Sequence, residues 1–65
     1  MYYIFFSTND VYIAEDILGN KGLSYEIVPT PVKDSVYCGV SIYSDEEPRV
    51  LKKLLASLSY ELVEE

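Results

Sequence analysis

The sequence contains no histidine, no tryptophan and a single cysteine, Cys38. Without histidine, the most common general acid–base catalyst of enzymes and the usual imidazole ligands of zinc are missing. One cysteine can form neither an internal disulfide nor a four-cysteine metal site. Any thiol chemistry of this chain therefore depends on Cys38 alone.

Basic residues are also scarce. The 65 residues include five Lys and Arg against eleven Asp and Glu, which gives a formal net charge of −6. Proteins that bind nucleic acids present basic surfaces to the phosphates, and anionic membranes likewise attract basic segments. We therefore expect neither nucleic acid nor a membrane surface among the partners.

No long hydrophobic run is present. The apolar stretch at residues 1–6 stops at Ser7. A secretory signal needs a basic start and a longer apolar region, and a membrane-spanning helix needs about 20 apolar residues. We expect a cytoplasmic protein, in which a lone thiol stays reduced.

The hydrophobic content of 49% is enough for a folded core. The length predicts a single domain over residues 1–65, because domains typically have about 100–150 residues. A domain this small hides only about 60% of the surface of its unfolded chain. Association with a second copy would support it, and the seven Tyr and two Phe suit an interface as well as a core.

Periodicity and capping residues predict six elements. Strands are expected at 2–6, 24–28 and 39–44, with a short last strand at 60–63, and helices at 10–19 and 46–58. Polar residues 7–10 can cap the first helix, and residues 19–22, with two glycines, end it.

This βαββαβ order predicts an α+β, two-layer ferredoxin-like sandwich, with an antiparallel sheet and both helices on one face. We expect strands 2–6 and 39–44 to lie parallel to each other at the centre of the sheet. The other face then lacks a helical cover. Its candidate residues are aromatic, namely Tyr3, Phe5 and Tyr43. An uncovered aromatic face predicts a homodimer.

A loop at residues 29–38 precedes the third strand. Pro29 and Pro31 cannot donate hydrogen bonds to a sheet, so they end the second strand. The loop is long for a hairpin connection, and long loops are often functional. Cys38 lies where it meets the strand, and Gly39 adds no bulk beside it. We expect a sulfur that solvent can reach, as a nucleophile or a persulfide or selenenylsulfide site requires.

Each of these residues also has a structural interpretation. A free cysteine is often a small buried hydrophobe, and no helix start adjoins Cys38 in the sequence. Ser35 can donate to a thiolate or cap the loop backbone. Lys33 can hold an anion or simply be solvated. The acidic residues 45–47 suit a helix start, so they predict no metal site, and no cofactor is expected.

The segment at residues 29–39 resembles the selenium/sulfur carrier-like family, and the resemblance covers nearly the whole chain. It is carried by a few short motifs: Phe6-Ser7, Glu15, Ile17-Leu18, Pro29-Thr30-Pro31, Ser35 and Cys38-Gly39. Members usually have Arg after the second proline, whereas this chain has Val32 followed by Lys33. If that Arg stabilises a thiolate or a carried anion, its contribution is weaker here.

The resemblance implies a sulfur or selenium carrier, a shuttle and not a self-contained enzyme, whose partners are donor and acceptor proteins. Cys38 would hold the transferred atom, and the binding residues would be Pro29, Thr30, Pro31, Lys33, Ser35 and Gly39. The alternative is a non-catalytic regulatory or assembly module that dimerises through its sheet and binds a small ligand. This second hypothesis follows from analogy of fold alone.

Overall fold

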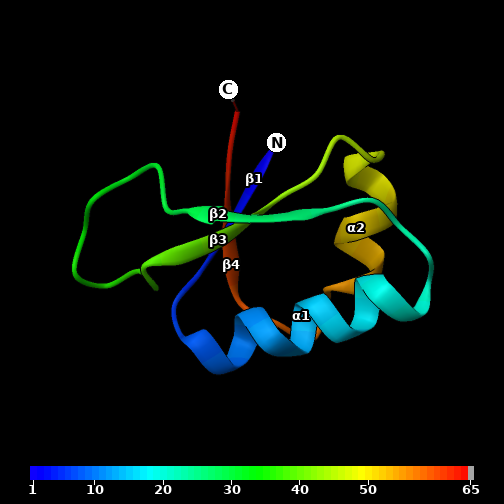
Figure 1. The fold of residues 1–65 in the computed structure, drawn as a ribbon, viewed down its shortest axis with the longest axis horizontal. Helices are drawn as coiled ribbons and strands as arrows, with labels where there is room; N and C mark the ends of the chain where they lie inside the picture. The colour runs from blue at the N-terminus through cyan, green and yellow to red at the C-terminus, as the bar shows by residue number, and fades with distance from the viewer. Residues whose placement is uncertain (65) are drawn as a thin grey trace.

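The computed structural model describes residues 1–64, which form an α+β fold of two helices packed on a four-stranded antiparallel sheet (Figure 1). The elements, in chain order, are β1 (Tyr2–Phe5), α1 (Thr8–Asn20), β2 (Glu26–Pro29), β3 (Val40–Tyr43), α2 (Pro48–Leu54) and β4 (Tyr60–Val63). Neither helix is long and apolar enough to cross a bilayer.

The order of strands in the sheet is β2-β3-β1-β4, and every neighbouring pair is antiparallel. The expectation that the two central strands are parallel is therefore wrong. The chain returns through α1, so that β2 runs in the same direction as β1. The connection after β2 then reverses the chain, and β3 inserts between β1 and β2, antiparallel to both.

The core lies between the sheet and the two helices. Tyr3 and Phe5 of β1 face this layer and are both 0% exposed. They pack with residues of both helices and with the residue that follows α2: Val11, Ala14, Leu18, Leu51 and Leu55. The prediction that Tyr3 and Phe5 form an uncovered face is therefore wrong, because the helices cover the side of β1 on which these two side chains lie.

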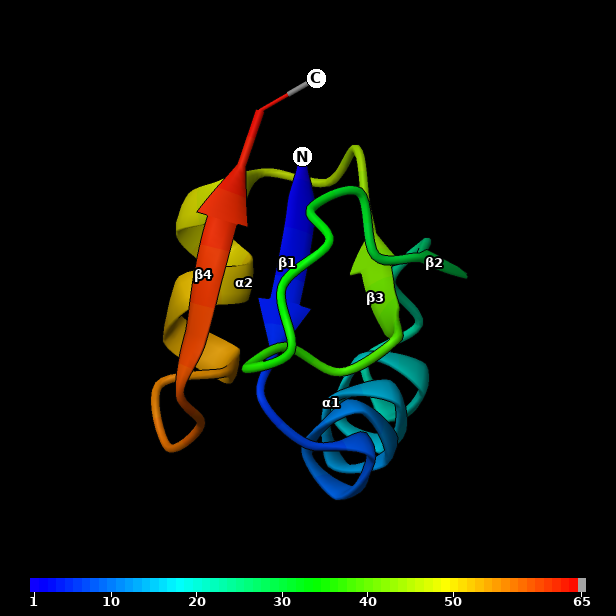
Figure 2. The ribbon, with the colours of Figure 1, turned by 90° about the vertical axis from the view of Figure 1, so that its left-hand side faces the viewer.

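Tyr43 does lie on the opposite face. It is half-buried and contacts Tyr2 edge to face, with ring centroids 5.0 Å apart. Part of this face is covered as well, since Ile4 and Ser41 are fully buried. Figure 2 shows the connection between β2 and β3 crossing in front of β1, on the side away from α2. The long loop thus covers part of the sheet that the helices leave open.

Helix α1 begins at Thr8, two residues before its predicted start, because Ser7 acts as the N-cap and its hydroxyl accepts from the Asp10 amide at 3.2 Å. The chain leaves the helix through Gly22, whose φ of 69° lies in the left-handed region.

Helix α2 is shorter than predicted and ends at Leu54. The amide of Leu58 donates to the Leu55 carbonyl at 3.0 Å, so the chain after the helix tightens into a turn. Leu55 is still fully buried and Leu58 packs against the core. The apolar pattern of this segment is therefore correct, but its last part is not α-helical.

Strand β2 includes Pro29, although prolines usually end strands. The Thr30 amide donates to the Gly39 carbonyl at 3.1 Å, so Thr30 and Gly39 form a hydrogen-bonded pair that extends the β2–β3 ladder. In an antiparallel ladder such positions alternate, so Ile27 and Pro29 turn their backbone groups toward the open edge of the sheet. Pro29 is tolerated because its missing N–H would have pointed away from β3.

The hydroxyl of Tyr3 is buried, with no hydrogen-bond partner among residues 1–64. Burial, with a smaller contribution from Tyr60, raises the pKa of Tyr3 above its ordinary value of 10.0. We expect Tyr3→Phe to leave the free energy of unfolding unchanged or to raise it by up to about 1–3 kcal/mol, because an unpaired polar group is removed while the ring stays. Urea denaturation at neutral pH measures this change.

Tyr3→Ala is the control and should cost about 3–5 kcal/mol, since it empties the core. Because the folded pKa of Tyr3 is raised, its contribution to stability is present below pH 10 and is lost as the pH rises through the folded value. Tyr3→Phe should therefore lose less stability than the wild type above pH 10. A variant that loses stability at neutral pH would show that the hydroxyl does have a partner.

Candidate functional site

Cys38 lies at a junction of three segments: the end of the long loop, the end of β1 and the start of α1. Its amide donates to the carbonyl of Phe5, the last residue of β1, at 2.9 Å. Its carbonyl accepts from the hydroxyl of Thr30 at 2.5 Å, and its sulfur lies 3.3 Å from the hydroxyl of Thr8. The backbone on both sides of the Cys38 side chain is thus fixed, by β1 at the amide and by the other end of the loop at the carbonyl.

Thr30 is the residue that joins the Pro-Thr-Pro motif to the Cys-Gly motif. Its hydroxyl proton goes to the Cys38 carbonyl, so the hydroxyl of Ser41, 2.8 Å away, must donate to Thr30. Pro31 follows Thr30 and restricts it to an extended backbone, in which the Thr30 amide reaches the Gly39 carbonyl. The predicted residues Thr30, Cys38 and Gly39 are therefore brought together.

The sulfur of Cys38 is less accessible than the sequence predicts. Cys38 is only 9% exposed and belongs to the core cluster. The bond to Phe5 aligns Cys38 with the end of β1 and turns its side chain inward under the start of α1. Because Thr8 itself is exposed, the sulfur lies directly beneath the surface at this point.

Thr8 is the site residue that the sequence does not reveal. It is the first residue of α1 and is separated from Cys38 by 30 positions, so only the fold brings the two side chains together. The sequence pattern shows a helix start at residues 7–10, but nothing places it beside the cysteine. A helix start does therefore adjoin Cys38 in space, although none adjoins it in sequence.

Lys33 and Ser35 lie at the exposed tip of the loop. The turn there is capped by Asp34, whose carboxylate accepts from the Val36 amide at 3.1 Å and whose carbonyl accepts from the Tyr37 amide at 3.0 Å. The backbone capping considered for Ser35 is thus provided by its neighbour. Gly39 is exposed, and a side-chain carbon there would meet no atom within 4 Å, so packing does not require glycine.

Tyr37 ties the loop to the far edge of the sheet. Its hydroxyl donates to the Glu61 carboxylate of β4 at 2.7 Å, and its ring lies on that of Phe6 with centroids 5.6 Å apart. The hydrogen bond to Glu61, followed by burial and the charges of Glu61 and Asp34, raises the pKa of Tyr37.

Residues 1–64 bring together no group of three or more Cys, Asp or Glu side chains that could hold a metal ion. A hollow of about 190 Å³ lies at the other end of β3 from Cys38. It is lined by Ser24, Tyr25, Glu26, Tyr43, Ser44 and Asp45. This hollow and the thiol are therefore separate.

We expect Thr30→Val to lower the free energy of unfolding by about 1–3 kcal/mol, because the shape is kept while the Cys38 carbonyl and the Ser41 hydroxyl lose their partner. Denaturant unfolding measures the loss, and Thr30→Ser, which keeps the hydroxyl, is the matched control. If Thr30→Val and Thr30→Ser are equally stable, the hydroxyl is not what holds the junction.

The raised pKa of Tyr37 predicts a pH dependence of the loop. The bond to Glu61 needs the protonated phenol, so its contribution is present below pH 10 and is lost as the pH rises through the raised value. We expect Glu61→Ala to bring the pKa of Tyr37 down toward 10.0. Titration of the ¹³Cζ resonance of Tyr37 measures it, and an unchanged midpoint would contradict the contact.

Comparison with known proteins agrees with the sequence motifs. No significant match to this chain was found among curated proteins or among solved structures. One family model does match, over residues 1–61, and the matched range includes Thr8, Thr30, Cys38 and Gly39. Because the match covers nearly the whole chain, the protein belongs to the family described as "Putative Se/S carrier protein-like".

Proposed function

We propose that the protein is a carrier of sulfur or selenium that holds the transferred atom on Cys38. The observation that carries the proposal is the junction itself: Cys38 is fixed at its amide and at its carbonyl, and the hydroxyl of Thr8, an exposed residue, lies 3.3 Å from its sulfur. Membership of the family supports a carrier role in general terms.

In the proposed step, the thiolate of Cys38 attacks the outer sulfur of a persulfide on a donor protein. A new sulfur–sulfur bond forms on Cys38 while the bond in the donor breaks, and the donor thiolate leaves. The proton of the Cys38 thiol goes to solvent, and no external oxidant or reductant is consumed. An acceptor thiolate then removes the outer atom by the same reaction.

The surroundings of the sulfur suit negative charge on it. The Thr8 hydroxyl can donate to a thiolate or to the terminal atom of a persulfide, and Thr8 opens a helix of 13 residues. The start of a helix favours a nearby anion. Lys33 and Ser35 lie at the exposed loop tip, where they would contact a donor or acceptor protein and not the sulfur.

Burial of Cys38 specifically favours a second candidate, a non-catalytic assembly or regulatory module. Cys38 would then be a packing residue, and the loop would serve to cover the sheet. The strand order β2-β3-β1-β4 supports a ferredoxin-like classification, and such domains often pair through their sheets. Of the predicted dimer residues only Tyr43, with its neighbour Tyr2, could take part.

The test of the carrier proposal is the intact mass of the protein after incubation with a cysteine desulfurase and cysteine. We expect a gain of one sulfur atom that a thiol reductant removes, and no gain in Cys38→Ser. Gly39→Ala is a second useful variant, because the added methyl group has room in the fold and adds bulk at the residue that follows Cys38 in the chain. It should fold normally and load more slowly.

Reaction with a disulfide reagent separates the two candidates. A carrier thiol reacts without denaturant, although more slowly than free cysteine because its sulfur is covered. If Cys38 reacts only after denaturation, and Cys38→Ser is destabilised by more than about 2 kcal/mol as expected for a disrupted core, the thiol is a packing residue.

A further inference from the structure

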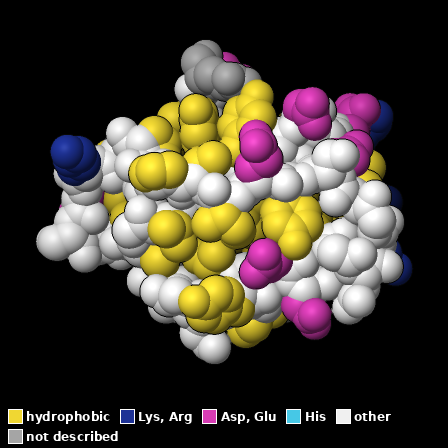
Figure 3. Space-filling view, in the orientation of Figure 1, with side chains coloured by type: hydrophobic (Ala, Val, Ile, Leu, Met, Phe, Trp, Pro, Cys, Tyr) yellow, Lys and Arg dark blue, Asp and Glu magenta, His cyan; other side chains and the backbone are white. Residues whose placement is uncertain are grey.

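β2 is an edge strand of the sheet, and apolar side chains lie beside its unpaired edge. The backbone N–H and C=O of Ile27 point away from β3, as does the C=O of Pro29. Ile27 is 43% exposed. Tyr12 is 63% exposed, and it lies on the same face of α1 as Glu15, three residues later, which interacts with Tyr25 beside β2. In Figure 3 hydrophobic side chains gather over β2 and the adjoining part of α1, which Figure 1 shows in the same orientation.

Carboxylates border this apolar edge. Tyr25, immediately before β2, lies beside Glu15 and near Asp16 of α1, and these charges, after burial, help raise the pKa of Tyr25. Glu26 is exposed on the other side of the strand. Figure 3 shows Asp and Glu around the hydrophobic side chains, whereas Lys and Arg are seen only at the margins of the view.

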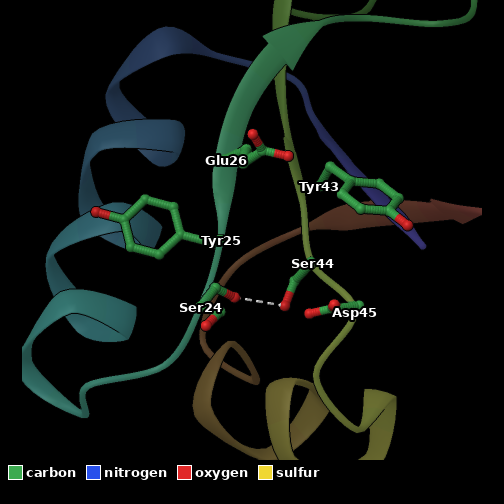
Figure 4. Close-up of a pocket in the computed structure, with 6 residues that line it drawn as sticks. All are labelled: Ser24, Tyr25, Glu26, Tyr43, Ser44 and Asp45. Atoms are coloured by element: carbon green, nitrogen blue, oxygen red, sulfur yellow. Dashed lines mark hydrogen bonds between the residues drawn. The ribbon is translucent and has the colours of Figure 1, made fainter.

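The hollow of about 190 Å³ lies at the start of the same edge (Figure 4). Two of its lining residues are joined by the hydrogen bond from the Ser44 hydroxyl to the Ser24 carbonyl, 2.7 Å long, and Glu26 and Asp45 are exposed lining residues. Pockets for small-molecule ligands usually measure about 300–1,000 Å³. This hollow has room for one side chain, and its two carboxylates favour a cationic one.

We propose that the β2 edge binds an extended, basic segment of a partner protein, which adds a fifth strand to the sheet. Its backbone pairs with Ile27, its apolar side chains contact Ile27 and Tyr12, and its Lys or Arg side chains approach Glu26 and Asp45. Addition of a strand to an exposed edge is an established mode of peptide recognition. The site is distinct from Cys38 and does not depend on the carrier function.

A second copy of the chain fits this edge poorly. Each copy carries a net charge of −6, and the carboxylates beside one β2 would face those beside the other. In addition, Pro29 has no N–H, so a symmetric β2–β2 pair would lose bonds on both sides of Ile27. Charge complementarity therefore selects a basic partner.

The probe is a capped heptapeptide of alternating Val and Lys, added to the ¹⁵N-labelled full chain. We expect amide shifts at residues 25–28 and at least tenfold slower hydrogen exchange of the Ile27 amide at saturation. Glu26→Lys should weaken binding at least tenfold. Glu64→Lys is the matched control, because it makes the same charge change after β4, at the opposite edge of the sheet, and should weaken binding less than threefold.

Two N-methylated peptides test strand addition itself. If the peptide pairs antiparallel to β2, its Val residues lie opposite Ile27 and their amides form the hydrogen bonds to β2. Methylation of the Val amides then abolishes binding, and methylation of the Lys amides does not. If the peptide pairs parallel to β2, the result is reversed. Equal sensitivity to both, or no protection of the Ile27 amide, overturns the proposal. Dimers that protect this amide without peptide would assign the edge to a second copy. Persulfide loading of Cys38 is unaffected by any of these outcomes.

Discussion

The hydroxyl of Thr30 makes the interaction on which the geometry around Cys38 depends. It donates to the Cys38 carbonyl and accepts from Ser41, so it joins the end of β2, the end of the long loop and the first half of β3. Phe5 fixes the same residue from β1. With its backbone held on both sides, Cys38 cannot move far without breaking bonds in a partly buried environment, where an unpaired group is costly.

The same junction accounts for the two properties of the thiol. The backbone bonds turn the side chain inward, which is why Cys38 is 9% exposed, and they place its sulfur against the first residue of α1. The fixed position of Cys38 and the burial of its side chain thus have the same cause. A carrier needs the first property to present an atom in a defined direction, and a packing residue needs only the second.

The sequence predicts the six elements and the α+β class because capping residues and apolar periodicity are local signals. Ser7 and Gly22 each lie where such signals place them. The path of the chain through α1 determines the direction of β3 relative to β1 and the burial of Tyr3. No local sequence pattern indicates that path. The sequence does not reveal Thr8 for the same reason, whereas it does indicate Thr30, which lies in a motif close to Cys38.

The clamp at the two ends of the loop has a consequence for what lies between them. Thr30 bonds to both Cys38 and Gly39, so the ends of the loop are fixed by the sheet and not by the residues at its tip. Each doubling of the length of a flexible loop raises the free energy of closing it by only about 0.6 kcal/mol. Segments of other lengths and sequences could therefore replace residues 32–36 while the thiol stays in the same position.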